Sequence, residues 1–267
     1  MKNDDSHDSM LLLKGTISKL RCYPREHDFI LTEAQHQQIG IAAIAATAMG
    51  MGSMGAGALG MARNSAEKAD WLEFELDCKK IQGWVWKMPL GTGDNVEVVA
   101  EHAGGNCYTA YAIWRIDDDL IAIYPHATAG RKAHYRKSAK AWIWCSVIGS
   151  LFFDLLMIVE GGAGMFVGKD MLFFFPASFF FNSIVVGVIA FRVSRKYKGF
   201  VSRAESIFRK FGWPDEGNVD LRRTSRERPG KYEILGFGET YFRYKAPENA
   251  KKLIPETSSL SLPSDSN

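Results

Sequence analysis

Two long apolar runs joined by a glycine-rich turn occupy much of the second half of the chain. The first run covers 141–159 (AWIWCSVIGSLFFDLLMIV), the turn 160–170 (EGGAGMFVGKD) and the second run 171–191 (MLFFFPASFFFNSIVVGVIAF). Each run is close to the length of about 20 residues that a helix needs to cross a bilayer. A buried hairpin of a soluble domain is the alternative, but runs this long and aromatic are rare in soluble cores. The pattern therefore predicts a transmembrane helical hairpin at 141–191.

Positive charge flanks the hairpin on both outer sides, whereas its turn holds Lys169 against Glu160 and Asp170. Cytoplasmic flanks of membrane helices carry an excess of lysine and arginine. Both flanks are therefore predicted to be cytoplasmic, and the turn is predicted to face the other side. The cations that we expect at the membrane surface are Arg131, Lys132, Arg136, Lys137, Lys140, Arg192, Arg195, Lys196 and Lys198.

Polar residues inside the hairpin are its most informative positions. Asp154 lies in the outer half of the first run, and an ionised aspartate at the bilayer centre costs about 2.5–3.5 kcal/mol. It should therefore be protonated, paired or exposed to a wet lumen. Ser178 lies at comparable depth in the second run, and Asn182 and Ser183 lie about one turn deeper. Either these residues hold the hairpin or its oligomer together, or they line a polar path through an assembly.

A second uncharged segment, 39–62 (IGIAAIAATAMGMGSMGAGALGMA), consists mainly of alanine and glycine. The absence of charge favours a third membrane helix that associates with itself, because small residues four apart let helices approach closely in lipid. A flexible loop is the alternative, since glycine disfavours helix. If the segment spans, residues 1–38 lie opposite the middle of the chain, which conflicts with a strand at 11–23 joining the middle sheet. The small residues spaced four apart are Ala48, Gly52, Ala56 and Gly60.

The middle of the chain is typical of β structure. Alternating, β-branched and aromatic residues between turn signals predict short strands. Short strands at this spacing predict a small barrel of the SH3 or OB type. We expect Trp84, Trp86, Val96 and Val98 in its core and Glu97 on the opposite face. The predicted strands of this region are 71–77, 81–88, 95–102, 108–116 and 120–126.

The segment 196–212 (KYKGFVSRAESIFRKFG) predicts a short amphipathic helix. Its apolar residues face either the bilayer interface or the β domain, and both interpretations stay open. These residues are Phe200, Ile207, Phe208 and Phe211.

The whole chain is thus predicted to be an α+β membrane protein with a small SH3/OB-like cytosolic barrel, a transmembrane helical hairpin and a third Gly/Ala-rich membrane segment. Its segments are 1–38 with one strand, 39–62 as the Gly/Ala-rich segment, 63–140 as the cytosolic β domain, 141–191 as the hairpin, 192–253 as a cytosolic amphipathic helix and hairpin, and 254–267 as a disordered tail.

Composition and motifs restrict the classes of function. The net charge is only +3, and much of the basic excess flanks the hairpin, so we expect no nucleic-acid partner. The four cysteines are far apart and predict reduced thiols. The acidic start with a four-residue apolar stretch does not predict a signal peptide.

Catalytic motifs are absent from the sequence: it has no phosphate loop, nucleophile elbow or zinc-binding helix. The prediction is therefore a protein without enzymatic activity, cofactor, metal or catalytic residue. His126 and His134 flank a basic stretch that we interpret as part of the flanking charge, although an enzyme acting on lipid head groups is a third hypothesis. Asp117, Asp118 and Asp119 could bind a cation, but three acids at a hairpin tip are usually just solvated.

The order of these segments resembles a family of bacterial proteins described as type VI secretion system effectors. The resemblance covers about residues 11–229 and rests on KGTISKL, the Gly/Ala-rich stretch, GWVWKMPLGTGDNVEVV and DDDLIAIYPHATAGRKAHYRK before the paired spans. It implies a Gram-negative source and a role in interbacterial competition. Together with the spans and their basic flanks, this predicts a multi-pass protein of the bacterial inner membrane with its main polar domains in the cytoplasm. It carries no catalytic residues.

Two functions follow as hypotheses. One is a pore-forming or membrane-depolarising effector, which Asp154 and the segment 39–62 favour. The other is a resident, non-enzymatic inner-membrane protein such as an immunity protein or assembly partner, because aromatic spans with basic flanks suit ordinary co-translational insertion. The expected partners are the lipid bilayer, further copies of the chain, and a cognate toxin, immunity or secretion-apparatus protein.

Overall fold

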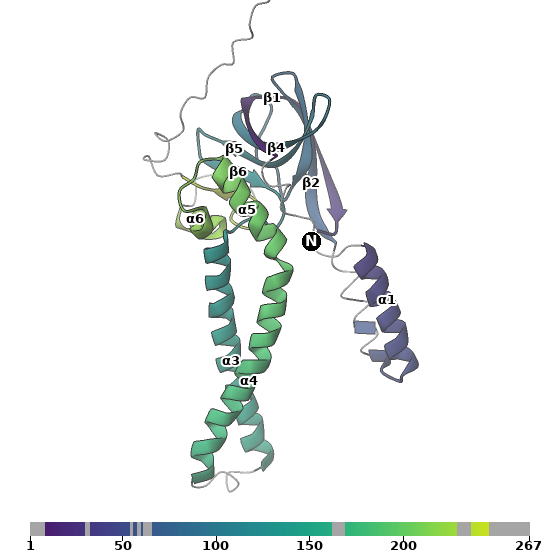
Figure 1. Ribbon diagram of the computed structural model, residues 1–267, viewed down its shortest axis with the longest axis vertical. Helices are drawn as coiled ribbons and strands as arrows, with labels where there is room; N and C mark the ends of the chain where they lie inside the picture. Colours follow the sequence, from purple (N-terminus) through teal and green to yellow (C-terminus); the bar gives the residue numbers. More distant parts are fainter. Residues whose placement is uncertain are drawn as a thin grey trace, which may run out of the picture. The chain divides into compact units, whose positions relative to one another are not determined.

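The computed structural model describes residues 9–29, 33–53, 56–57, 60, 66–161, 169–228 and 236–245. The predicted tail at 254–267 lies outside this part. The chain divides into two compact units, and Figure 1 colours the chain along its sequence. The first comprises 1–125, 209–214 and 221–267, and the second comprises 126–208 and 215–220.

A closed five-stranded β-barrel forms the first unit. Its strands follow the order β3-β2-β1-β4-β5, and β3 also pairs with β5 in parallel, which closes the barrel. The other pairings in the sheet are antiparallel. Two further strands extend the sheet beyond β5 in the order β6-β7. The strands are β1 (Met10–His27), β2 (Glu67–Leu76), β3 (Lys79–Val85), β4 (Asn95–Gly104), β5 (Cys107–Arg115), β6 (Leu120–Ile123) and β7 (Phe242–Arg243).

The barrel takes its strands from a wider stretch of sequence than predicted. Five strands were expected within the middle region, but β1 belongs to the barrel and β6 lies outside the closed ring. The long β1 serves two neighbours because its first half pairs with β4 and its second half with β2. The register shifts between Ser18 and Arg21, where Lys19 has a positive φ of 52°. Such a bulge bends a strand sharply, which lets β1 pass from one neighbour to the other.

The barrel core confirms two of the four expected core residues. Val96 and Val98 are fully buried, and Glu97 on the opposite face pairs with Lys14 at 2.8 Å. The expectation for Trp84 and Trp86 is wrong. Alternation along β3 places Ile81, Gly83 and Val85 inward, so the tryptophans are only partly buried.

The helices of the second unit include two that are long and apolar enough to cross a membrane. They are packed side by side along the hairpin, as Figure 1 shows for α3 and α4. Their outer surfaces expose large apolar side chains, with Trp144, Leu151 and Phe180 each about two-thirds accessible. The helices whose bounds lie within the described residues include α1 (Glu33–Ala48), α3 (Arg131–Gly161), α4 (Lys169–Lys196), α5 (Lys198–Lys210), η3 (Glu216–Asn218) and α6 (Leu221–Glu227).

The predicted amphipathic helix forms as α5. Its apolar residues Ile207 and Phe208 are fully buried, and Phe211 just beyond it is 2% exposed. These side chains therefore pack inside the protein and do not face a bilayer. Of the two interpretations offered for this helix, packing against protein holds for these three residues.

The Gly/Ala-rich segment does not form one continuous helix. Helix α1 ends at Ala48, and Gly50 adopts a positive φ of 81° in the turn that follows. Ala48 therefore ends one helix and Gly52 follows the turn, so the four-residue spacing of Ala48, Gly52, Ala56 and Gly60 does not run along a single helix face.

Candidate functional site in the helical hairpin

A row of polar groups runs along the face of α3 that contacts α4. Trp142, Ser146, Ser150 and Asp154 are spaced by four residues, which places them on one side of a helix. We call these residues and their partners on α4 the polar seam. The partners on α4 are Ser178, Asn182 and the backbone carbonyl of Ser183.

The outer end of the polar seam is the Asp154–Ser178 pair. Ser178 Oγ lies 2.7 Å from Asp154 Oδ1 and 3.0 Å from the carbonyl oxygen of Phe175, so its single hydroxyl hydrogen has two acceptors in reach. Asp154 is only 8% exposed. The carboxyl group therefore lies against α4 and away from the outer surface of the hairpin.

The middle of the polar seam is made by Asn182. Its side-chain amide donates to the carbonyl oxygen of Ser146 at 2.9 Å and to Ser150 Oγ at 3.0 Å. An amide NH₂ has two hydrogens, so both bonds form at once. A Cβ on Gly149 would lie 3.0 Å from Asn182 Nδ2, and its absence leaves room for the amide.

The inner end of the polar seam involves the indole of Trp142. Its Nε1 donates to the carbonyl oxygen of Ser183 at 3.0 Å. A Cβ on Gly187 would lie 3.2 Å from this nitrogen, so glycine there lets the ring approach α4. Further along, His134 Nε2 lies 3.0 Å from Ser194 Oγ. Polar contacts therefore connect the two helices along most of their described length.

Three of the four predicted intramembrane residues come together in this seam. Asp154, Ser178 and Asn182 contribute side chains, whereas Ser183 contributes its backbone carbonyl. Sequence reasoning missed Ser146 and Ser150, although their four-residue spacing with Asp154 was visible. The arrangement pairs Asp154 with Ser178 and Ser150 with Asn182 inside one chain, an arrangement that suits residues holding a hairpin together.

No family model, curated protein or solved structure matches this chain.

Replacing Asn182 with leucine tests the polar seam. The change removes both hydrogen bonds, and interhelical bonds of this kind contribute about 0.6–1.7 kcal/mol each. We expect the unfolding free energy in detergent to fall by about 1–2 kcal/mol, measured by SDS titration with circular dichroism. Ser183→Ala is the matched control because it keeps the carbonyl that Trp142 uses. Equal stability of Asn182→Leu and Ser183→Ala would argue against the seam.

Three cations of the basic flank are held by acids of the same unit. Lys132 Nζ lies 2.9 Å from Asp215, and Lys137 Nζ lies 2.8 Å from Asp220. Arg131 binds the largely buried carboxylate of Glu205 through its guanidinium at 2.9 Å, and its backbone N–H donates to the same group at 2.9 Å. A carboxylate at a helix N-terminus satisfies a free N–H and the helix dipole. Glu205 thus fixes the start of α3.

The other predicted membrane-surface cations are not part of these three ion pairs. Arg195 lies over the ring of Phe191, with its Cζ 5.7 Å from the ring centroid. The five remaining cations form no ion pair with the residues that the structure describes. They are Arg136, Lys140, Arg192, Lys196 and Lys198.

The two histidines of the basic stretch pack on one aromatic ring. The ring centroid of Tyr197 lies 5.8 Å from that of His126 and 6.4 Å from that of His134. Both histidines therefore take part in packing within the second unit. Across the part of the chain that the structure describes, no group of three His, Cys, Asp or Glu side chains is placed to hold a metal ion.

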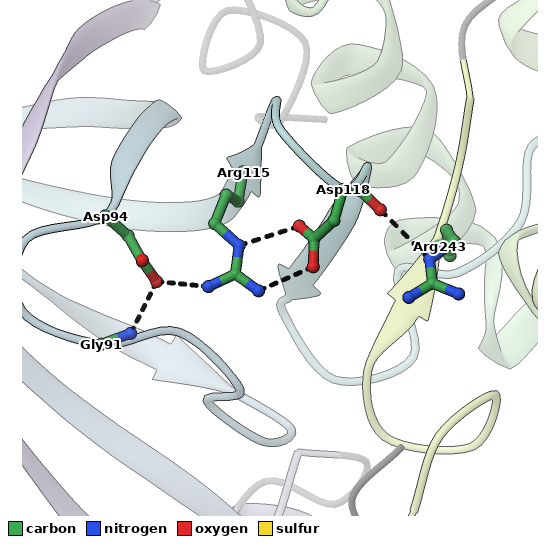
Figure 2. A network of polar contacts seen from close by, with 5 residues as sticks. All are labelled: Gly91, Asp94, Arg115, Asp118 and Arg243. Carbon is green, nitrogen blue, oxygen red and sulfur yellow. Dashed lines mark hydrogen bonds and ion pairs between the residues drawn. The ribbon is translucent and has the colours of Figure 1, made fainter. Parts of the chain in front are cut away.

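The acidic hairpin tip is part of an ion-pair network in the first unit. Figure 2 shows Arg115 between two carboxylates, bonded to Asp118 through Nε (2.8 Å) and Nη2 (2.7 Å) and to Asp94 through Nη1 (2.6 Å). The Gly91 N–H also donates to Asp94 at 2.8 Å, and Arg243 Nε donates to the carbonyl oxygen of Asp118 at 3.1 Å. Asp118 is thus an ion-pair partner of Arg115.

This network predicts a specific acid dependence. Burial raises the pKa of Asp118, but the hydrogen bonds and charge of Arg115 outweigh burial and hold that pKa below its usual range. A depressed pKa stabilises the fold above the unfolded-state pKa, and this stability is lost as pH falls through the folded-state pKa. The loss therefore falls below about pH 4.

We expect Asp118→Asn to flatten this acid dependence in urea unfolding followed by tryptophan fluorescence. Because the Asp118 side chain is 38% exposed, its contribution at neutral pH should stay below about 1 kcal/mol. Asp117→Asn is the matched control, because this exposed neighbour makes none of the bonds to Arg115. An Asp118→Asn protein with the wild-type acid loss would contradict this role of the network.

An outward-facing aromatic surface on the barrel also escaped sequence reasoning. Trp84 stacks on His27 with ring centroids 5.0 Å apart and meets Trp71 at 5.1 Å. Phe29 lies 5.6 Å from both Trp84 and Tyr124. These five residues, which we call the aromatic surface, are partly exposed. Inward and outward side chains alternate along β3. Because Val85 faces the core, its neighbour Trp84 faces outward, and this signal was missed.

Proposed function

We propose that this chain is a resident, membrane-anchored protein whose helical hairpin holds the small barrel at a bilayer surface, where the barrel binds a partner. The observation that supports this proposal is the polar seam. Within one hairpin, Ser178 bonds to Asp154, and Asn182 bonds to Ser150 and to the backbone carbonyl of Ser146, while large apolar side chains cover the outer surface. A hairpin of this kind is stable in lipid without further chains.

A pore makes a different demand on the same residues. Polar side chains that line a conducting path must face water or a neighbouring subunit. Asp154 is 8% exposed and Asn182 uses both amide hydrogens inside the hairpin. The geometry therefore supports an anchor better than a membrane-depolarising effector.

The location and partner of the anchored barrel are part of this proposal. Basic residues before the first helix and after the second, away from the turn, support a cytosolic barrel at a bacterial inner membrane. The Greek-key order of the barrel, with its parallel β3–β5 pair, supports an OB-type domain, a fold that commonly binds ligands on its surface. Exposed aromatic rings are frequent in binding surfaces, so an immunity or assembly role with a protein partner is consistent with the aromatic surface.

Inducible expression in a Gram-negative host tests the proposal. We expect the protein to stay in the membrane fraction after carbonate washing and to leave the membrane potential unchanged, measured with a potential-sensitive dye. Depolarisation that Asp154→Leu abolishes at equal protein level would instead support the effector hypothesis. Release of the protein by carbonate would contradict anchoring itself.

A further inference from the structure

The segment that joins β1 to β2 begins and ends at one place on the barrel. β1 pairs with β2 from Ile17 and Leu76 to His27 and Glu67, with one register shift between Ser18 and Arg21. His27 ends one strand and Glu67 begins the other, so the two ends of the intervening 28–66 segment are direct neighbours. Partners in an antiparallel pair have Cα atoms only about 4.5–5.5 Å apart.

This pairing restricts how the segment can meet a membrane. His27 and Glu67 lie on the same side of a bilayer, because they are partners in one antiparallel strand pair. A segment between them crosses the bilayer an even number of times or not at all. A single span over 39–62 is therefore incompatible with the folded barrel.

Helix α1 nevertheless has the surface of a lipid-facing element. Ile41, Ile44 and Met49 expose 68%, 70% and 76% of their surface, and no charged residue occurs in 39–62. The apolar part, Gln38–Ala48, is about 16 Å long at 1.5 Å per residue. That length covers about half of a hydrocarbon core of about 30 Å.

The end of α1 satisfies its backbone N–H groups internally. The N–H groups of Met49, Gly50 and Met51 donate to the carbonyl oxygens of Ala45, Thr47 and Ala46 at 2.9–3.1 Å. Thr47 Oγ1 also donates to the carbonyl oxygen of Ala43 at 2.9 Å. Backbone donors in lipid must be bonded in this way, and the positive φ of Gly50 lets the chain reverse direction there.

We propose that α1 and the turn after it form a re-entrant element, which enters the bilayer from the barrel side, contacts lipid acyl chains and returns to that side. The occupant of the exposed apolar surface is lipid because the charge-free sequence and the bonded turn suit hydrocarbon. The inference rests on the proposed membrane anchoring, since a protein outside the membrane has no bilayer to enter.

Cysteine labelling tests the inference in the full-length protein. In a background with serine at Cys22, Cys78, Cys107 and Cys145, one cysteine is placed at Ile44 or at Ser53. The control retains Cys78 alone, because this exposed residue lies at the β2–β3 turn. Each protein is treated with a membrane-impermeant maleimide in intact cells and in inverted inner-membrane vesicles.

We expect Cys78 to react only in inverted vesicles and Ile44→Cys to react at least about tenfold more slowly there, because the thiolate that reacts forms in water. Ser53→Cys should not react in intact cells. Bimane attached to Ile44→Cys in proteoliposomes should be quenched by brominated lipid acyl chains. The result would then assign the protection to lipid.

Three results would overturn the inference: Ile44→Cys reacting as fast as Cys78, Ser53→Cys reacting in intact cells, or a protected bimane that brominated lipid does not quench. The last would mean that protein covers α1. Failure of the anchoring proposal looks different, because carbonate washing would then release all variants, including the Cys78 control.

Discussion

Replacing Gly83 with alanine is expected to open the barrel. A Cβ at this position of β3 would lie 2.4 Å from the carbonyl oxygen of Ala110 on β5 and 3.1 Å from two more backbone atoms of that residue. Backbone cannot rotate away as a side chain can, so the parallel β3–β5 pair that closes the barrel has to separate. Overpacking of this kind costs about 2–4 kcal/mol.

The measurement is chemical unfolding of the Gly83→Ala protein in detergent, followed by tryptophan fluorescence. Gly91→Ala is the matched control because nothing lies within 4 Å of the Cβ it adds and its φ is not in the left-handed region. We expect the control to stay within about 0.5 kcal/mol of wild type. If both variants unfold at the same denaturant concentration, the close approach of β3 to β5 is not required for the barrel.

Gly130→Ala is expected to displace the start of α3. The added Cβ would lie 2.1 Å from the carbonyl oxygen of Glu216 and 2.7 Å from the backbone of Gly217. The Gly130 N–H also donates to the carbonyl oxygen of Val219 at 2.9 Å, and its carbonyl accepts from the His134 N–H at 2.9 Å. Any shift that relieves the clash therefore strains the first turn of α3, and we expect a loss of about 3 kcal/mol or more.

Limited proteolysis and thermal unfolding of the membrane-extracted protein report this change. With about 3 kcal/mol lost, the melting temperature should fall by several degrees. The control is Gly199→Ala in α5, which meets nothing within 4 Å and should be neutral or slightly stabilising because alanine favours helix over glycine. A Gly130→Ala protein as stable as Gly199→Ala would show that the 216–217 backbone does not constrain this position.

The hairpin and most strands of the barrel were accessible from the sequence because their signals are local. Long apolar runs specify α3 and α4, and alternation with turn residues specifies β2 to β6. The polar residues in α3 and α4 were also visible, and their contacts follow from helical spacing. The sequence therefore predicts Asp154, Ser178 and Asn182 as polar residues of the hairpin, and their hydrogen bonds join α3 to α4.

Nonlocal pairing could not be predicted from the same signals. Membership of β1 in the barrel depends on the bulge near Lys19 and on contacts with β2 and β4, which are distant in sequence. The proposed re-entrant path of 39–62 rests on that pairing, whereas the composition of the segment alone favoured a single span. Trp84 was misplaced because its neighbours Gly83 and Val85 both face inward, and a glycine in the core leaves no apolar signal.

Ion-pair partners were similarly beyond the sequence. The basic residues before the hairpin were predicted to lie at the membrane surface. However, Arg131 pairs with Glu205 and Lys137 pairs with Asp220. These acids lie more than 70 residues away in the chain, so no local pattern connects them. Asp118 shows the same effect at short range, since three consecutive acids suggest solvent exposure until Arg115 is placed between Asp94 and Asp118.

Intramolecular crosslinking tests the central claim most directly, namely that the polar seam closes within one hairpin. In the cysteine-free background, Asp154→Cys and Ser178→Cys are combined in one chain and oxidised in native membranes. We predict a disulfide within single chains, detected as a shift of the monomer on a non-reducing gel, because Ser178 Oγ and Asp154 Oδ1 are 2.7 Å apart. Covalent dimers in place of a crosslinked monomer would show that Asp154 faces another subunit, and would contradict the self-contained anchor.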